Sequence, residues 1–459
     1  MVPADDGAVA VPDPTSRDAM VAWLDGHTNY ELAMPTRLGA PTLHRMERLC
    51  ALLDDPQLAA PVLHITGTNG KGSTARILTE LLMAKGLSVG TYTSPNLDRV
   101  NERLTRNGEP VADDELAEVL AALAPFEELV GERCNRFELL TAAAFRWFAD
   151  SPVDVAVVEV GLGGRWDATN VVEPDVAVVT NVSYDHVEVL GPTLLDIARE
   201  KAGIVKPGCR LVVGETEPEL RDVFVAAADA NGVAETWVRG QDYECEASRV
   251  AVGGRLLDLR TPAASYPDLF LPLHGAHQGV NAAGALAAAE SFFGAPLSAD
   301  VVAQAFAGVR VPGRTEVVGR SPLVVLDGAH NVAGAHALAQ TLVEEFPHDD
   351  VTVVVGMLHG RDPSAVLEPF AAMGVRHVVT CTAPSPRALP SAEIAEAARA
   401  LGLAAQGADT VGDAVTLALG HVGTEGTLVV TGSLYVVTEA RALFLGSTST
   451  AEPGSLSGP

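Results

Sequence analysis

A glycine-rich stretch that contains a lysine and a hydroxyl residue could bind the phosphates of a nucleotide. It reads Thr66-Gly67-Thr68-Asn69-Gly70-Lys71-Gly72-Ser73. Glycines let backbone N–H groups close around phosphate oxygens, Lys71 adds a positive charge, and the hydroxyl of Ser73 suits Mg²⁺. The spacing departs from the common G-x-x-x-x-G-K-[ST] loop, because Gly72 stands between the lysine and the hydroxyl. On this stretch alone, a glycine-rich turn that binds no ligand remains an alternative.

Two further side chains stand at the ends of apolar runs. Glu159 lies near the end of the run 153–160, and His186 follows the run 176–182. Ligands of a parallel sheet bind at the carboxyl ends of its strands, so both side chains could reach the phosphate loop. Glu159 could then bind Mg²⁺. For His186, a polar residue with purely structural hydrogen bonds is the alternative.

Lys201, in the predicted helix 194–204, has two interpretations. It could be a lysine on the helix surface that pairs with Glu200. If it is carbamylated, it carries a carboxylate that can bind a second Mg²⁺. Sequence spacing does not decide between them.

Two loops carry carboxylates whose role the sequence leaves open. Asp167 and Thr169 follow a glycine turn, where hydrogen bonds within the turn are the simpler explanation. Asp327 and His330 end a predicted strand, and Asn331 opens a helix as a candidate N-cap. The alternative is that Asp327 and His330 face a ligand-binding cleft.

Alternating strands and helices must position these side chains. Residues 61–65 form a predicted strand, and residues 73–85 carry apolar side chains at helical spacing. Strands that alternate with helices of 10–15 residues predict an α/β fold with a doubly wound, mostly parallel sheet. Short alternating runs in residues 235–273 predict a small antiparallel sheet. Further strands are expected at 88–93, 153–160, 176–182, 209–214, 323–326, 351–355, 377–380 and 427–431, and further helices at 113–123, 136–148, 194–204, 276–293 and 331–345.

The 459 residues exceed what one hydrophobic core usually serves, so we expect two domains. The first, residues 16–308, contains the phosphate loop, and the second, residues 309–445, is a smaller α/β domain. A Pro-Gly-Arg turn at residues 312–314 favours a hinge between them. Residues 1–15 and 446–459 have the composition of disordered ends.

Composition excludes several classes of protein. The net charge of −28 argues against binding to the nucleic-acid backbone, which requires clustered Lys and Arg. No apolar run reaches the roughly 18 residues of a membrane span, and the N-terminus lacks the pattern of a secretory signal. We expect a cytoplasmic monomer whose partners are small molecules.

Together these motifs resemble those of folylpolyglutamate synthase/dihydrofolate synthase, in the Mur ligase superfamily. The resemblance covers about residues 40–440 and keeps the order of the family. Gly-Leu-Gly-Gly-Arg-x-Asp-Ala-Thr-Asn and Arg-Glu-Lys-Ala-Gly-Ile are the motifs most particular to the folate branch. The matching segments are 66–73, 93–95, 159–170, 185–186, 199–204, 312–314 and 327–331.

The resemblance implies an ATP-dependent amide ligase with a Mur-ligase-like fold. Such an enzyme adds L-glutamate to dihydropteroate, to tetrahydrofolate or to both, through an acyl phosphate, and releases ADP and phosphate. It implies a central ATP-binding domain followed by a Rossmann-like glutamate-ligase domain, and it implies ATP and two Mg²⁺ ions as ligands. Members that perform both reactions are common among bacteria, so we expect a bifunctional enzyme.

The resemblance also assigns a role to each motif position. The ATP phosphates would contact Thr68, Asn69, Gly70, Lys71, Gly72 and Ser73. The adenine would contact Asn281, and Arg314 and Asp327 would contact phosphate and ribose. Ser73 and Glu159 would bind one Mg²⁺, and His186 with carbamylated Lys201 a second. The folate site would include Ser94, Pro95, Asp167 and Thr169, and the glutamate site His330 and Ser433. Lys71, Lys201, His186 and His330 would act in catalysis.

Two positions depart from the family. Asn96 stands where the family usually has histidine, and Trp166 stands where it has a smaller aliphatic residue, both in segments expected near the pterin.

Three alternative functions remain: a Mur-type ligase for a different acid, a phosphate-loop kinase for a small molecule, and a nucleotide-binding regulator without activity. The intact Lys71, Glu159 and Lys201 argue against the last.

Overall fold

The computed structural model describes residues 16–32, 43–347 and 349–446, which divide into two compact units. The first unit extends to Pro272 and resumes over His277–Arg310, and the second contains Leu273–Ala276 and the chain from Val311 onward. The expected boundary at residues 308 and 309 lies two residues before the change between units. The ends predicted to be disordered lie, except for Gly446, outside the described residues.

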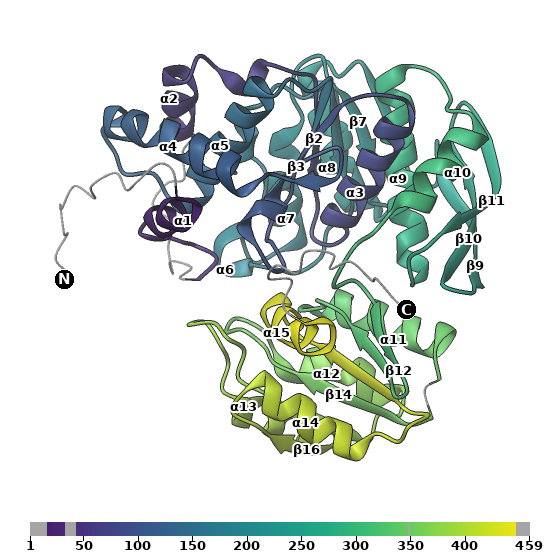
Figure 1. Cartoon of the computed structure of the whole chain (residues 1–459). Helices are drawn as coiled ribbons and strands as arrows, with labels where there is room; N and C mark the ends of the chain where they lie inside the picture. Colours follow the sequence, from purple (N-terminus) through teal and green to yellow (C-terminus); the bar gives the residue numbers. More distant parts are fainter. Residues whose placement is uncertain (1–15, 33–42, 348, 447–459) are drawn as a thin grey trace, which may run out of the picture. The chain divides into compact units, whose positions relative to one another are not determined.

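A mostly parallel sheet of eight strands organises the first unit (Figure 1). Its strand order is β4-β3-β2-β5-β1-β6-β7-β8, and β3 and β4 run antiparallel at one edge. The loops after β5, β1 and β6 are therefore neighbours at the carboxyl edge of the sheet, where ligands of such folds bind. The strands are β1 (Val62–Thr66), β2 (Val89–Tyr92), β3 (Leu104–Arg106), β4 (Glu109–Pro110), β5 (Val155–Glu159), β6 (Val176–Val179), β7 (Arg210–Val213) and β8 (Glu235–Val238).

The central strands are apolar because helices cover both faces of the sheet. Every residue of β1, β5 and β6 is buried, so these strands lack the alternation of a strand with one exposed face. The α-helices of the first unit are α1 (Arg17–Asp25), α2 (His44–Leu52), α3 (Lys71–Ala84), α4 (Asp113–Val130), α5 (Arg136–Asp150), α6 (Val187–Leu190), α7 (Leu194–Lys201), α8 (Pro218–Asn231), α9 (Ala276–Phe293) and α10 (Ala299–Gly308). Short 3₁₀ helices cover Pro56–Leu58, Val100–Arg103, Ala168–Val171 and Ala202–Ile204.

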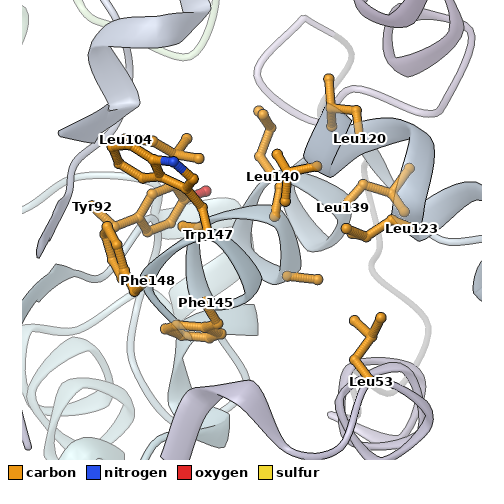
Figure 2. Packing of buried hydrophobic residues seen from close by; sticks show 14 of the residues in the cluster. Leu53, Tyr92, Leu104, Leu120, Leu123, Leu139, Leu140, Phe145, Trp147 and Phe148 are labelled. Carbon is orange, nitrogen blue, oxygen red and sulfur yellow. The ribbon is translucent and has the colours of Figure 1, made fainter. Parts of the chain in front are cut away.

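Helix α5 is the centre of a large hydrophobic cluster (Figure 2). Its Phe145 and Phe148 are buried, and Figure 2 shows Tyr92 of β2 and Leu104 of β3 beside the aromatic end of this helix. Burying a large apolar side chain contributes about 1.5–3 kcal/mol, so the cluster anchors α5 on the sheet. The labelled members are Leu53, Tyr92, Leu104, Leu120, Leu123, Leu139, Leu140, Phe145, Trp147 and Phe148.

A separate antiparallel sheet of three strands precedes α9. Its order is β11-β10-β9, with β9 (Glu244–Ala251), β10 (Gly254–Arg260) and β11 (Ser265–Leu271). The prediction of a small antiparallel sheet is thus confirmed. The first residues of the predicted range, 235–238, are an exception, because they form β8, which pairs with β7 in the parallel sheet.

The second unit has its own sheet of six strands, ordered β12-β13-β17-β14-β15-β16. Strand β12 (Glu316–Arg320) is antiparallel to β13 (Leu323–Leu326), and the other neighbours pair in parallel. The remaining strands are β14 (Val351–Val355), β15 (His377–Thr380), β16 (Ala404–Gly407) and β17 (Thr427–Thr431). The helices are α11 (Val332–Glu345), α12 (Pro363–Ala372), α13 (Ser391–Ala400), α14 (Val411–His421) and α15 (Leu434–Leu445).

The doubly wound α/β architecture predicted from sequence is confirmed in both units. Several predicted bounds differ from the structure. The strand expected over 176–182 ends at Val179, the helix expected over 113–123 continues through Pro125 to Val130, and the helix expected over 194–204 ends at Lys201 and is followed by a 3₁₀ turn. Among the described residues, no helix is long and apolar enough to cross a membrane.

Candidate active site

The glycine-rich stretch is a loop between the central strand β1 and helix α3. Gly67 has φ +150° and Gly70 φ +82°, and α3 begins at Lys71. The first N–H groups of a helix have no partner inside it and carry the positive end of its dipole, so they can bind phosphate oxygens. The backbone of this loop therefore has the conformation of an anion-binding site.

Two lysines share one carbonyl oxygen of this loop. Lys71 Nζ donates to Gly67 O at 3.2 Å and to Thr68 O at 3.3 Å, and Lys201 Nζ donates to Gly67 O at 2.7 Å. Lys201 is 3% exposed, so the interpretation as a surface lysine is wrong. Burial and the charge of Lys71 lower the pKa of Lys201 to about 7. A substantial fraction of Lys201 is therefore a neutral amine near pH 7.

Glu159, at the end of β5, lies beside the start of α3. Its Oε2 accepts a hydrogen bond from Ser94 N at 3.1 Å, and a Cβ built on Gly72 would lie 3.5 Å from Oε2. Ser73 is buried in the first turn of the same helix. The structure thus brings together Ser73, Glu159 and Ser94, as the strand order requires.

His186 lies in the loop after β6, on the opposite side of β1. It has φ +51° and is the N-cap of the short helix α6, with Nε2 3.6 Å from Asp185 Oδ1. Asn69, in the phosphate loop, reaches the same segment, because its Nδ2 donates to Ser183 Oγ at 3.3 Å. The segment that carries His186 is therefore attached to the phosphate loop.

Asp167 and Thr169 form the turn that follows β5. Asp167 Oδ1 accepts from the backbone N (3.0 Å) and the hydroxyl (2.5 Å) of Thr169, and Oδ2 accepts from Leu162 N at 2.8 Å. His64 Nε2 lies 2.9 Å from the Thr169 hydroxyl, and burial lowers the pKa of His64 to about 3. These contacts account for both residues as turn residues, and substrate contact by them stays a prediction.

Asn281 of α9 packs against the phosphate loop. Its Nδ2 donates to Gln278 Oε1 at 3.0 Å, and its carboxamide occupies the space that a Cβ on Gly70 would need. Asn281 is thus beside the nucleotide-binding loop, and its contact with adenine stays a prediction.

In the second unit, Asp327 holds the loops at the carboxyl end of β13. Its Oδ2 accepts from the backbone N (2.7 Å) and hydroxyl (3.0 Å) of Thr315, and Oδ1 accepts from Ala329 N at 2.8 Å. Arg314 lies beside Gly328 in the same loops. The contacts predicted for Arg314 and Asp327 with phosphate and ribose stay predictions.

His330 and Ser433 belong to adjacent loops of the second unit. They follow β13 and β17, which are neighbours, and Gly432 N donates to Ala329 O at 2.9 Å. His330 Nδ1 lies 2.8 Å from Gly328 O, whereas Ser433 is the N-cap of α15 and accepts from Tyr435 N. Asn331 caps α11, as expected, through Gly334 N at 2.8 Å.

Besides Ser183, which forms hydrogen bonds with Thr68 and Asn69, two residues that contact the phosphate loop were not predicted as site residues. Asn181 and Thr180 bind the backbone of Asn69, but both were assigned to the strand 176–182. The change from Val176-Ala-Val-Val to the polar pair Thr180-Asn181 is the signal that could have placed the strand end correctly.

Two family models match the chain. Residues 65–289 match the Mur ligase middle domain, and residues 313–434 match the glutamate ligase domain of Mur ligases. The phosphate loop lies in the first match, and Asp327 and His330 lie in the second. Fold and site thus define an ATP-dependent ligase of the Mur type.

Similar proteins narrow this class. The chain is 37% identical to the dihydrofolate synthase/folylpolyglutamate synthase of Mycobacterium tuberculosis, over 96% of this chain and 98% of that protein. The solved folylpolyglutamate synthase of M. tuberculosis complexed with ADP superimposes with a TM-score of 0.88 at 37% identity, covering 94% of this chain and 99% of that one. The solved structure of E. coli FolC in complex with DHPP and ADP superimposes with a TM-score of 0.80 at 32% identity, covering 92% of this chain and 97% of that one.

The chain belongs to the dihydrofolate synthase/folylpolyglutamate synthase family. This confirms the resemblance, the fold and the ligase class expected from the motifs. A phosphate-loop kinase is not supported, because the second unit matches a glutamate ligase domain.

Proposed function

We propose that the protein joins the α-amino group of L-glutamate to the carboxylate of dihydropteroate and to the terminal carboxylate of tetrahydrofolate, at the expense of ATP. The observation that carries this proposal is the 37% identity, over almost the whole length of both chains, to a relative named for both activities. A phosphate loop at which Lys71 and Lys201 both donate to Gly67 O is consistent with an enzyme that binds ATP, and it supports the proposal on chemical grounds.

The reaction has two steps. An oxygen of the acceptor carboxylate attacks the γ-phosphorus of ATP, and ADP leaves, which produces an acyl phosphate. The α-amine of glutamate then attacks the acyl carbon, phosphate leaves with the bridging oxygen, and the amine loses a proton. Activation is necessary because a free carboxylate has no adequate leaving group, whereas phosphate is a good one.

The phosphate loop performs the first step. Lys71, whose ammonium group lies at Gly67 O and Thr68 O, would donate to the ATP phosphates, and the N–H groups at the start of α3 would bind the same anion. Gly70, Gly72 and Ser73 would complete this phosphate site, and Thr68 and Asn69, whose N–H groups donate to Asn181, would hold the loop in the conformation that binds the anion. Positive groups fixed around the transferred phosphoryl oxygens stabilise the charge that spreads over them.

The residues beside the loop fit Mg²⁺. Among the described side chains no group of three or more His, Cys, Asp or Glu could hold a metal, but Mg²⁺ usually takes one or two carboxylates plus waters and substrate phosphates. Ser73 and Glu159 would hold one ion. When bound, Mg²⁺ neutralises phosphate charge and polarises the γ-phosphoryl group.

Carbamylation of Lys201 would complete a second cation site with His186. The reaction requires a neutral amine, which adds to the carbon of CO₂ and loses a proton, and a pKa of about 7 supplies that amine near neutral pH. The carboxylate so formed replaces a buried ammonium beside Lys71 with an anion. The carbamylated Lys201 would therefore attract a cation, whereas its ammonium form would repel one.

The remaining assignments concern the organic substrates. Asn281 would contact adenine, Arg314 and Asp327 would contact phosphate and ribose, and His330 and Ser433 would position glutamate. Ser94, Pro95, Asp167 and Thr169 would form part of the folate site. Asn96 and Trp166 are the residues at which this chain would differ from its relatives in pterin binding.

The test is ADP release by the purified protein with ATP, Mg²⁺ and L-glutamate, with dihydropteroate or tetrahydrofolate as acceptor. The proposal predicts turnover with both, and products one glutamyl residue heavier by mass spectrometry. Lys71→Ala should be inactive, whereas Lys85→Ala, which removes an exposed lysine, should retain activity. Turnover with one acceptor restricts the activity to that step, and turnover only with an unrelated acid would favour a Mur-type ligase of different specificity.

A monomeric state and a cytoplasmic location stay predictions.

A further inference from the structure

A dense set of hydrogen bonds attaches the phosphate loop to the segment Thr180–Ser183. Thr68 N donates to Asn181 O at 2.9 Å, and Ser183 N donates to the Thr68 hydroxyl at 3.0 Å, which itself donates to Ser183 O at 3.1 Å. The loop is thus paired with a second backbone segment through contacts within the protein itself.

The side chain of Asn181 makes the most specific of these contacts. Its Oδ1 accepts from Asn69 N at 3.0 Å, and its Nδ2 donates to Asn69 O at 2.9 Å. The hydroxyl of Thr180 donates to the same carbonyl at 2.7 Å. Both polar groups of the Asn69 peptide backbone are therefore held by neighbouring side chains.

These contacts decide which N–H groups remain for a phosphate. The N–H groups of Thr68 and Asn69 point to Asn181, so the anion site starts at Gly70 and the first turn of α3. On the other side, the carboxamide of Asn281 fills the space beside Gly70. The loop is fixed between two elements, and it can bind phosphate without first being ordered.

We propose that Asn181, supported by Thr180, is a positioning residue that keeps the phosphate loop in its nucleotide-binding conformation. The proposal rests on the proposed function only in taking this loop as the ATP site. The same segment continues to His186, so it also fixes where that side chain lies relative to the loop. Asn181 acts through the backbone of Asn69 and need not touch the nucleotide.

The test is the affinity for ADP, measured by calorimetry with the purified full-length protein and no other substrate. Asn181→Ala should weaken ADP binding about tenfold, because two hydrogen bonds to the Asn69 backbone are lost. Thr180→Val, which keeps the shape but not the hydroxyl, should weaken it about threefold, and Thr180→Ser should restore most of the affinity. As a matched control, Asn231→Ala, which removes a side-chain hydrogen bond at the end of α8, should bind ADP normally.

Steady-state kinetics separate positioning from a general structural role. The proposal predicts that Asn181→Ala raises the KM for ATP and leaves the KM for glutamate and for the acceptor unchanged. ADP affinity within twofold of the original protein would overturn it, as would an equal rise in all three KM values together with a large fall in Tm. Failure of folate glutamylation by the unmodified protein would instead overturn the proposed function, since ADP binding does not depend on the acceptor.

Discussion

Replacing Lys201 by methionine should stabilise the protein while it abolishes activity. The Lys201 side chain is buried and donates one hydrogen bond, at 2.7 Å, to Gly67 O. Its pKa is lowered to about 7 by burial and by the charge of Lys71. Methionine has a similar length and no charge, so it removes the cost of burying an ammonium group.

The magnitude follows from the difference in pKa between the two states. A change from 10.5 in the unfolded chain to about 7 corresponds to about 5 kcal/mol, at about 1.4 kcal/mol per pH unit. Because the folded-state pKa is the lower one, the penalty is complete below pH 7 and disappears as the pH rises towards 10.5. About 3 kcal/mol remains at about pH 8, and the lost hydrogen bond offsets about 1 kcal/mol, since Lys71 still donates to that carbonyl.

The assay is differential scanning calorimetry in buffer freed of CO₂, without Mg²⁺ or nucleotide. At about pH 8 the net difference of about 2 kcal/mol should raise the Tm of Lys201→Met above that of the original protein by about 3 °C, because the unit that contains Lys201 is large and its unfolding entropy is correspondingly high. The difference in Tm should become smaller as the pH approaches 10, because the original protein no longer has to bury a charged Lys201 there, whereas the variant has no such charge at any pH. Lys85→Met, at an exposed position, should leave the Tm unchanged. A variant that melts at or below the original protein, or a Tm difference that does not change with pH, would show that the Lys201 ammonium group does not destabilise the folded state.

Three further substitutions test other parts of the site. Gly70→Ala should weaken ADP binding at least about tenfold, because the φ of Gly70 is +82° and a Cβ there would clash with the side chain of Asn281 in α9. Gly86→Ala is the control, because Gly86 has φ +89° but open space around it, so this variant shares only the backbone strain. Glu159→Gln should raise the Mg²⁺ concentration for half-maximal activity about tenfold, since a neutral amide is a weaker ligand; an unchanged Mg²⁺ titration would remove Glu159 from the metal site. Asp327→Ala should lower the free energy of unfolding by about 2–4 kcal/mol in urea denaturation, because two backbone N–H groups and the Thr315 hydroxyl lose their acceptor, and a loss below about 1 kcal/mol would contradict that account.

The sequence predicted those features that depend on local pattern. Strand β1, the glycine turn and helix α3 follow one another directly, so apolar runs and glycines located the phosphate loop without tertiary information. The helix 276–293 and the strand 323–326 were predicted with the bounds that the structure gives. Asn331 was recognised as an N-cap because its partner, Gly334, is three residues away.

Contacts between distant segments could not be predicted in this way. Lys201 donates to Gly67 O across 134 residues, and only the order of strands around β1 brings them together. Burial, the largest cause of the lowered pKa of Lys201, is likewise a tertiary property, so spacing alone could not exclude a surface lysine. Asn181 was missed because the predicted strand continued past Val179, which concealed a polar side chain that binds the phosphate loop.

Transfer of an oxygen isotope from the acceptor carboxylate to phosphate tests ligation through an acyl phosphate most sharply. Dihydropteroate labelled with ¹⁸O in its carboxylate is incubated with the protein, ATP, Mg²⁺ and L-glutamate, and the released phosphate is analysed by mass spectrometry. Ligation through an acyl phosphate predicts one ¹⁸O atom in each phosphate and the other in the new amide. Unlabelled phosphate, released together with the glutamylated product, would show that the carboxylate oxygen never attacked the γ-phosphorus and would contradict the account.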